Sequence, residues 1–350
     1  MTGSAAAGIA GLAGQRTMAA SPSGLLVPAE EDRHERTFMQ WPNSRRVYRE
    51  KTFLAMVQQT VADIANTIVD FEPVVLLAAR DQHDAARKYL SAKVELWDVA
   101  TEDLWCRDSG PLFAKQPDGK LAVSHIQFNG WGGRQVHRQD GLVAERVAER
   151  LELPLIASGL KGEAGGVEHD GHGLLMAHES SWVNNNRNAG LSRDDVERRL
   201  LAAYGAREMI WSAGVKGQDI TDYHIDSLAR FTGSGRVLIN LPDQPDMNDP
   251  FHAAALDTHN KLLAARLEVE VIPEPVSRRV KSIDFVASYA NYYACNGGVI
   301  AAQFGDRETD RIAVVALQKH YPNREIVTLN VDALGEIGGG IHCATQQMPA

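Results

Sequence analysis

The sequence predicts an α/β fold of repeated modules arranged around an axis, and three observations support this prediction. Turn dipeptides that end in glycine, each flanked by strand-like runs, occur four times and are typical of β-hairpins. They follow one another at almost regular intervals. A helical stretch and then a short strand come after each turn, so the repeated unit is hairpin, helix, strand. The dipeptides are Asp118-Gly119, Asp170-Gly171, Ser234-Gly235 and Asn296-Gly297.

Hydrophobic periodicity places the elements in chain order. Apolar residues recur every three or four positions from Arg49 to Ile68, which predicts an amphipathic helix, and Val74 to Ala78 is then typical of a buried strand. A fifth unit combines this helix and strand with the C-terminal segment. The alternative is an ordinary mixed α/β sheet in which the spacing is a coincidence. The helices after the four turns are expected at roughly Asp140 to Leu151, Ser192 to Tyr204, Asp249 to Leu263 and Arg307 to His320.

Length and composition predict one domain for residues 25–350. With 350 residues, of which 44% are hydrophobic, the chain can bury a sizeable core, and no linker interrupts the modules. Residues 1–24 are rich in alanine and glycine and are expected outside this fold, as a disordered tail or as the remnant of an export signal that lacks a basic start. A cytoplasmic location is the first expectation, and a truncated signal peptide would make the protein exported or periplasmic.

Charge and hydropathy argue against several classes of partner. The formal net charge of -9 disfavours nucleic acid and anionic membranes and favours a cationic ligand. There is no apolar run of about 18 residues, so we expect no membrane span. The sequence also lacks a glycine-rich nucleotide loop, the paired cysteines of zinc sites and a His-Glu-x-x-His motif. We therefore expect no cofactor and no metal.

One cysteine stands out as a candidate nucleophile. Cys106, Cys295 and Cys343 form no even disulfide framework, so free thiols are expected. Cys343 follows three glycines and a histidine, in the segment Gly338 to His342. A thiol on a flexible glycine loop can meet a substrate with nothing covering it, whereas a structural cysteine lies in an apolar strand or helix. Cys343 is therefore the candidate nucleophile, and the other two cysteines are assigned to packing.

Acids and bases precede successive hairpin turns at equivalent places. Asp108 precedes the first turn, Glu163 the second, and His224 with Asp226 the third. If the modules surround an axis, these side chains converge at one mouth, where the loop of Cys343 can join them. A thiol, a histidine and several carboxylates in one pocket are typical of nucleophilic catalysis on a cationic substrate.

The same residues suggest how a guanidinium group would react. Asp108 and Asp226 can grip the planar cation through paired hydrogen bonds and leave its carbon open to sulfur. His224 would protonate the departing ammonia and then activate water. Glu163 would bind another guanidinium nitrogen or orient the histidine.

Aromatic residues and competing hypotheses complete this interpretation. Trp105 and Trp131 are expected to pack against the cation and exclude water, although both could simply belong to the core. A second hypothesis is a non-catalytic protein that holds a cationic ligand in the same acidic mouth. A third is a metal hydrolase, because His169, His172 and His178 lie close together in the sequence.

Several motifs occur in a fixed order from about residue 27 to the end. They are His34 to Thr37 with Trp41-Pro42, Trp105 to Pro111, Phe128-Asn129 with Trp131 to Gly133, Glu163 to Gly166, Asn186 to Asn188, Thr221 to Asp226, Ser288-Tyr289 with Asn296 to Gly298, and Gly338 to Gln347. In these segments the chain resembles the agmatine deiminase and bacterial-type peptidylarginine deiminase family.

The resemblance implies a fold and a reaction. The family has the pentein fold, a five-bladed α/β propeller of pseudo-symmetric modules, and its members are often homodimers or larger, so a homo-oligomer is expected. Its hydrolases convert a guanidino group to a ureido group through a covalent thiouronium intermediate, without a cofactor. The resemblance implies that Cys343 is the nucleophile, that His224 is the acid and base, and that Asp108, Asp226 and Glu163 bind the guanidinium.

Departures from the family pattern bear on the substrate. Where this chain has Asp219 to His224, agmatine deiminases usually have the sequence Asp-Glu-Thr-Asp-Gly-His. The glutamate of that sequence helps to accommodate the distal amine of the substrate. Here Ile220 supplies no charge and Tyr223 replaces a glycine, so we expect altered amine recognition. Glu30 is expected to face a substrate amine, or Arg33 a substrate carboxylate. Agmatine, which would place the enzyme in putrescine biosynthesis, is the first choice of substrate, and free or peptidyl arginine is the alternative.

Overall fold

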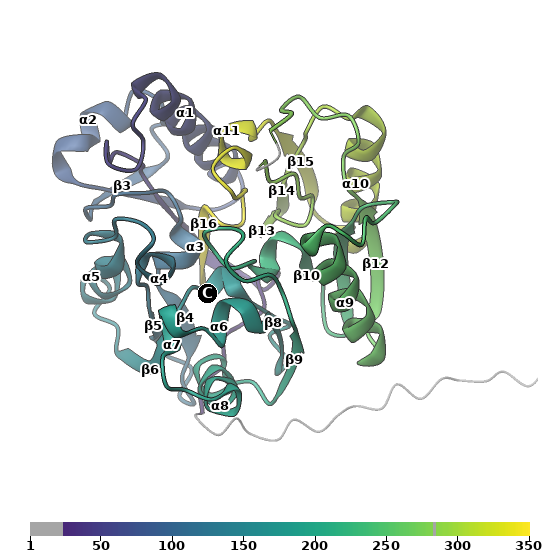
Figure 1. The fold of residues 1–350 in the computed structure, drawn as a ribbon. Helices are drawn as coiled ribbons and strands as arrows, with labels where there is room; N and C mark the ends of the chain where they lie inside the picture. The colour runs from purple at the N-terminus through teal and green to yellow at the C-terminus, as the bar shows by residue number, and fades with distance from the viewer. Residues whose placement is uncertain (1–23, 283–284) are drawn as a thin grey trace, which may run out of the picture.

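The computed structural model describes residues 24–282 and 285–350, which form five small β-sheets around a common centre. In Figure 1 the sheets surround the middle of the molecule and the long helices lie outside them. This arrangement confirms the predicted α/β propeller of five modules. The predicted tail lies outside the described residues except for Gly24. Within the described ranges, no helix is both long and apolar enough to cross a membrane.

Four of the sheets share one order of elements. In each, an antiparallel hairpin is followed by a helix, which returns the chain to a third strand parallel to the second. The predicted unit of hairpin, helix and strand is therefore confirmed. The four modules are β4 (Leu112–Lys115), β5 (Leu121–Gln127), α5 (Val143–Arg150) and β6 (Leu155–Lys161); β7 (Val167–His169), β8 (Leu174–His178), α8 (Arg193–Tyr204) and β9 (Glu208–Ser212); β10 (Ala229–Phe231), β11 (Arg236–Leu241), α9 (Pro250–Ala264) and β12 (Glu268–Pro273); and β13 (Tyr293–Cys295), β14 (Gly298–Ala302), α10 (Arg307–His320) and β15 (Glu325–Leu329).

The two ends of the described chain build the fifth sheet together. Strand β16 (Thr345–Pro349) pairs antiparallel with β1 (His34–Gln40), and helix α1 (Lys51–Ile68) leads to β2 (Val74–Ala78), which is parallel to β1. Strand β3 (Glu95–Asp98) extends this sheet beyond β2. The fifth predicted unit is thus confirmed.

Local interactions explain why the long helices begin where the sequence indicates. Ser192 and Asp195 form a reciprocal capping box at the start of α8. Asp249 caps α9 and Asp306 caps α10. The helix predicted from Asp140 begins instead with a 3-10 turn, where the Asp140 carboxylate accepts hydrogen bonds from the backbone N–H groups of Glu102 and Asp103.

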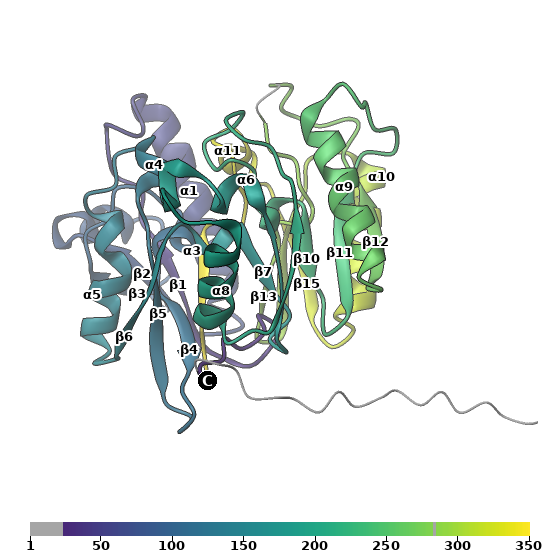
Figure 2. The ribbon, with the colours of Figure 1, turned by 60° about the horizontal axis from the view of Figure 1, so that its bottom comes forward.

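Short helical turns connect the modules and supply the polar residues of the centre. Figure 2 shows α4, α6 and α11 at one end of the molecule, opposite to the end where the chain terminates. Loops from different modules therefore meet at this end. The short helices are η1 (Arg80–Gln82), α2 (His83–Ala86), α3 (Cys106–Ser109), α4 (Gly130–Gly133), η2 (Asp140–Leu142), η3 (Ala164–Gly166), α6 (Glu179–Trp182), α7 (Asn185–Asn188), η4 (Ile225–Ser227) and α11 (Asp332–Gly335).

Replacing Ile64 by alanine is expected to lower the free energy of unfolding by about 2–5 kcal/mol, because the change leaves a cavity under α1. Ile64 is 0% exposed, whereas Met56 on the same helix is 55% exposed. Urea unfolding followed by circular dichroism measures both variants. Met56→Ala is the control and should change stability by no more than about 0.5 kcal/mol. Equal losses in the two variants would contradict this packing of α1.

Candidate active site

Cys343 lies in the turn between α11 and β16. Its thiol donates a hydrogen bond to Asp226 Oδ2 at 3.3 Å and accepts one from Asn291 Nδ2 at 3.1 Å. Cys343 is only 7% exposed, which differs from the expected uncovered thiol on a flexible loop. The preceding glycines allow close packing instead, since a Cβ on Gly340 would lie 2.5 Å from Asn291 Oδ1.

His224 precedes η4 and faces two carboxylates. Its Nε2 lies 3.2 Å from Glu163 Oε2, and its Nδ1 lies 3.7 Å from Asp108 Oδ1. Burial by itself would lower the pKa of this imidazole, but Asp108, Glu163 and Asp226 outweigh burial and raise the pKa to about 9. His224 is therefore protonated at neutral pH and can act as a proton donor.

Only one of the two carboxylate oxygens of Asp108 on α3 accepts a hydrogen bond. Oδ2 accepts a hydrogen bond from Trp131 Nε1 at 2.9 Å. Oδ1 is buried and has no hydrogen-bond partner among the described residues. Burial raises the pKa of Asp108 to about 6, against the attraction of protonated His224. Because an unpaired buried acceptor is costly, this oxygen marks a place for a hydrogen-bond donor.

Asp226 on η4 contacts both the thiol of Cys343 and the ring of His342. Its Oδ2 accepts a hydrogen bond from His342 Nδ1 at 2.8 Å. Burial alone raises the pKa of Asp226, but the hydrogen bond and charge of His342 lower it below its ordinary value. Burial, followed by the charges of Asp226 and Asp108, raises the pKa of Cys343 well above its ordinary value. The resting group is therefore a thiol beside a carboxylate.

These groups line one small pocket with about 40 Å³ of free space, enough for a small planar group. Gly165 on η3 makes their approach possible, because a Cβ there would lie 2.6 Å from Asp108 Oδ1 and 3.0 Å from His224 Nδ1. The pocket is lined by Trp105, Asp108, Trp131, Gln135, Ile220, Thr221, His224, Asp226, Ser227, Ile337, Gly338 and Cys343.

The structure brings most of the predicted site residues to this pocket, and Glu163 is placed just behind it. Glu163 does not line the pocket but contacts His224, and Arg187 Nε donates to Glu163 Oε2 at 2.9 Å from the other side. Of the two roles expected for Glu163, this placement favours orientation of the histidine.

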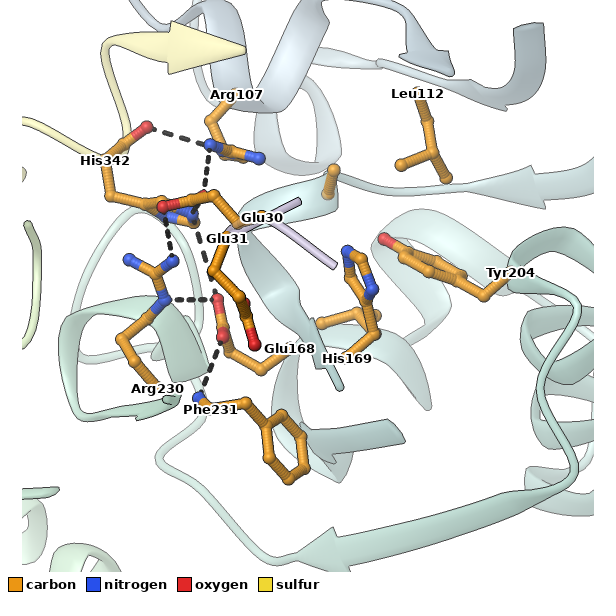
Figure 3. A pocket seen from close by; sticks show the side chains of 12 residues that line it. Glu30, Glu31, Arg107, Leu112, Glu168, His169, Tyr204, Arg230, Phe231 and His342 are labelled. Atoms are coloured by element: carbon orange, nitrogen blue, oxygen red, sulfur yellow. Dashed lines mark hydrogen bonds and ion pairs between the residues drawn. The ribbon is translucent and has the colours of Figure 1, made fainter. Parts of the chain in front are cut away.

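Glu30 does not reach the pocket of Cys343, which differs from its expected place beside a substrate amine. Its carboxylate lies 2.9 Å from Arg107 Nη2, Arg230 Nη2 and His342 Nε2. Figure 3 shows this cluster around a separate small cavity. Burial raises the pKa of Glu30, but these cations outweigh burial and hold it well below its ordinary value. Both oxygens are thus occupied by cations of the protein itself.

His342 connects this buried cluster to the pocket. Its two ring nitrogens face Asp226 Oδ2 and Glu30 Oε2, at 2.8 and 2.9 Å. Only an imidazolium can donate to both carboxylates. The backbone N–H of Arg107 also donates to the carbonyl of Cys343 at 3.0 Å. Contacts with the buried residues His342 and Arg107 therefore help to fix the orientation of the Asp226 carboxylate and the position of the Cys343 thiol.

The two departures from the family pattern have different consequences. Tyr223 has a φ of 68°, a left-handed conformation that glycine adopts without strain. Its ring stacks on His178 with centroids 4.7 Å apart and meets Phe251 edge-on, and it does not line the pocket. Tyr223 therefore contributes no surface to this pocket. Ile220 does line the pocket and makes that part of its wall apolar.

Sequence reasoning missed Asn291 and the role of Arg187. Asn291 bonds to the thiol across 52 residues of chain, and no motif or periodicity marks it. Arg187 belongs to a motif noted in the sequence, and its ion pairs with Glu163 and Asp222 could have been suspected only from its charge.

The histidines that suggested a metal site lie in separate environments. His169 packs against Tyr204, and His178 Nδ1 bonds to the carbonyl of Tyr223 at 2.7 Å. No group of three or more His, Cys, Asp and Glu side chains in residues 24–282 and 285–350 is arranged to hold a metal ion.

Comparison with known proteins identifies the family. A sequence model of the Porphyromonas-type peptidyl-arginine deiminase family matches residues 26–349. A Streptomyces coelicolor protein provisionally named agmatine deiminase is 32% identical over 336 residues, which cover 92% of this chain and 98% of that protein. The solved structure of an agmatine deiminase from Enterococcus faecalis is 27% identical, with a TM-score of 0.85 over 96% of this chain and 99% of that one. A substrate-bound agmatine deiminase structure from C. jejuni shares the fold, with 22% identity and a TM-score of 0.84 over 93% of this chain and 96% of that one.

The fold and the pocket define a pentein with a thiol at its centre. The chain belongs to the Porphyromonas-type peptidyl-arginine deiminase family, whose members are hydrolases that act on C–N bonds of linear amidines.

Replacing Asp108 by asparagine is expected to lower the pKa of His224 from about 9, because Asp108 is the strongest of the charges that raise it. NMR titration of the His224 ring measures the midpoint directly. Asp118→Asn, in an exposed hairpin turn, is the control and should leave the midpoint in place. A midpoint that stays the same in the Asp108 variant would contradict this electrostatic coupling.

The raised pKa also predicts a pH dependence of stability. Protonated His224 stabilises the fold fully below the ordinary histidine pKa of about 6.5, and this contribution is lost as the pH rises through about 9. The free energy of unfolding should therefore fall over this window in the parent protein, and fall less in Asp108→Asn. Urea unfolding at several pH values measures the difference.

Proposed function

We propose that this protein is a guanidino hydrolase that converts agmatine to N-carbamoylputrescine and releases ammonia. The observation that carries the proposal is Oδ1 of Asp108, a buried oxygen that accepts no hydrogen bond in the described chain and lies in the same small pocket as Asp226 and the thiol of Cys343. Two carboxylates beside a thiol match a planar cation whose carbon is attacked by sulfur. The agmatine deiminase names of the Streptomyces relative and the Enterococcus structure support this substrate.

Substrate binding itself would prepare the nucleophile. The negative charges of Asp226 and Asp108 help to keep the Cys343 proton in place. A guanidinium held between these carboxylates neutralises that field, so the pKa of the thiol falls and the thiolate forms next to the carbon that it attacks. The thiols of Cys106 and Cys295, which do not line this pocket, would not be activated in this way.

The chemistry then proceeds in two halves at one carbon. Sulfur adds to the guanidinium carbon, His224 gives its proton to the departing nitrogen, and ammonia leaves behind a thiouronium on Cys343. The now neutral His224 takes a proton from water, whose oxygen adds to the same carbon. Collapse of this adduct breaks the C–S bond, frees the ureido product and returns the thiol. The proton lost by the thiol passes to solvent as the substrate binds, and ammonia takes a proton from solvent when it leaves as ammonium.

Free or peptidyl arginine is a second candidate substrate. The family whose model matches is named for peptidyl-arginine, and Ile220 gives this pocket an apolar wall where an amine would need a charge. Assays of ammonia and ureido product with agmatine, free arginine and an arginyl peptide distinguish the candidates. Turnover of none of the three would contradict the proposed function.

Cys343→Ala is expected to reduce turnover by at least about 1,000-fold, because the covalent intermediate can no longer form. Ammonia release in steady-state assays measures the loss, and circular dichroism checks the fold. Cys295→Ala, which removes a buried thiol that lies outside the pocket, should retain turnover. Activity that survived in Cys343→Ala would exclude this mechanism.

Gly165→Ala is expected to lower kcat/KM by at least about 10-fold, because the added methyl would sit within 2.6 Å of Asp108 Oδ1 and displace the oxygen that faces the guanidinium. Gly141→Ala is the matched control, since its added carbon would meet nothing closer than 3.4 Å. The same kinetic assay compares the two. Similar kinetics for both variants would show that the close approach at Gly165 is not needed.

A further inference from the structure

A second cavity adjoins the pocket of Cys343, and the two share the walls Trp105, Gln135 and Ile337. The second cavity, called here the tail cavity, is much larger, with about 410 Å³ of free space. It is lined by Val47, Tyr48, Arg49, Glu50, Phe53, Asp103, Trp105, Gln135 and Ile337. The two cavities are therefore neighbours that meet at these three side chains.

The smaller pocket offers no counter-charge for a distant substrate amine. Its charged lining residues are Asp108, His224 and Asp226, which surround the thiol. Its lining also includes Ile220 and Ile337, whose side chains carry no charge, and Ile337 belongs to the shared wall. An ammonium at the far end of an alkyl chain would have to leave this pocket to find a carboxylate.

The tail cavity does offer such a carboxylate. Glu50 is exposed, and its side chain makes no hydrogen bond or ion pair in the described part of the chain. Asp103, the other acid of the lining, is buried, and its two oxygens are taken by Tyr48 and by Gln135 Nε2 at 2.6 Å. Asp103 therefore shapes the cavity while Glu50 remains able to pair with a ligand.

The lining of the tail cavity favours a cation over an anion. Tyr48, Phe53 and Trp105 present aromatic surface, which attracts alkyl chains and ammonium groups alike. Glu50 is the one acid of this lining whose carboxylate is open to a ligand, and Arg49 is its one basic side chain. A tail that carried a carboxylate would meet Arg49 but would also face Glu50.

We propose that the tail cavity is the subsite for the substrate's tail, that it takes an alkyl chain ending in a primary ammonium, and that Glu50 is its counter-charge. This inference rests on the proposed function, because it assumes that the guanidinium end occupies the pocket of Cys343. It assigns the specificity for a tail with one amine to Glu50, which lines the tail cavity and does not line the pocket of Cys343.

Steady-state kinetics with three guanidines test this assignment: agmatine, an alkylguanidine of equal length without the amine, and L-arginine. Glu50→Gln should raise KM for agmatine about 2- to 5-fold, the range for one exposed ion pair, and leave kcat unchanged. KM for the alkylguanidine should not change. Arg49→Gln should not raise KM for agmatine. Glu149→Gln, an exposed glutamate on α5, is the matched control and should behave like the parent.

The outcomes separate the subsite from the proposed function. If the parent turns over at least one guanidine but Glu50→Gln leaves KM for agmatine unchanged, the subsite assignment is overturned while the function stands. If L-arginine is the better substrate and Arg49→Gln raises its KM, the tail cavity takes an amino-acid tail and the monoamine assignment is overturned. If no guanidine is turned over, both proposals fall together.

Discussion

The carboxylate of Asp226 joins the thiol of Cys343 to the buried charges at the centre of the molecule. Its Oδ2 lies 2.8 Å from His342 Nδ1 and 3.3 Å from the sulfur of Cys343. His342 is bound in turn by Glu30, whose charge is balanced by buried arginines. Charges at this depth persist only when they are paired and hydrogen-bonded, so removal of one partner leaves another uncompensated. The same network therefore holds the interior together and sets the direction from which Asp226 faces the thiol.

The ring of modules explains how residues far apart in the chain reach one pocket. Short helical turns of successive modules end near the common centre, where α3 brings Asp108, η3 brings Gly165 and η4 brings Asp226. The loop of Cys343 enters between them just before β16 closes the ring against β1. Because each group stands on a short turn anchored to its own sheet, the reacting groups are positioned by packing and not by a flexible loop.

Burial gives this pocket its electrostatic character. It raises the pKa of the thiol and of Asp108, while the surrounding carboxylates keep His224 protonated. In the proposed function, a cationic substrate pairs with the carboxylates of the pocket. Its charge offsets their negative charge and permits the thiolate of Cys343 to form. In the proposed assignment, the tail cavity across the shared wall of Trp105 recognises the remainder of the substrate. The chemistry and the choice of substrate are thus assigned to different side chains.

The sequence by itself determined most of the fold and the identity of the candidate nucleophile. Hairpin turns, helix caps and periodicity are local signals, and the glycine-rich segment before Cys343 is a local motif, so each can be recognised without the rest of the chain. Only the tertiary structure decided which acids face the pocket. Both Glu30 and Asp108 were expected at the substrate, but Glu30 is bound by arginines from other modules whereas one oxygen of Asp108 accepts no hydrogen bond in the described chain. The contact of Asn291 with the thiol was equally hidden, because pairing between modules depends on how they pack around the centre and leaves no mark on the local sequence.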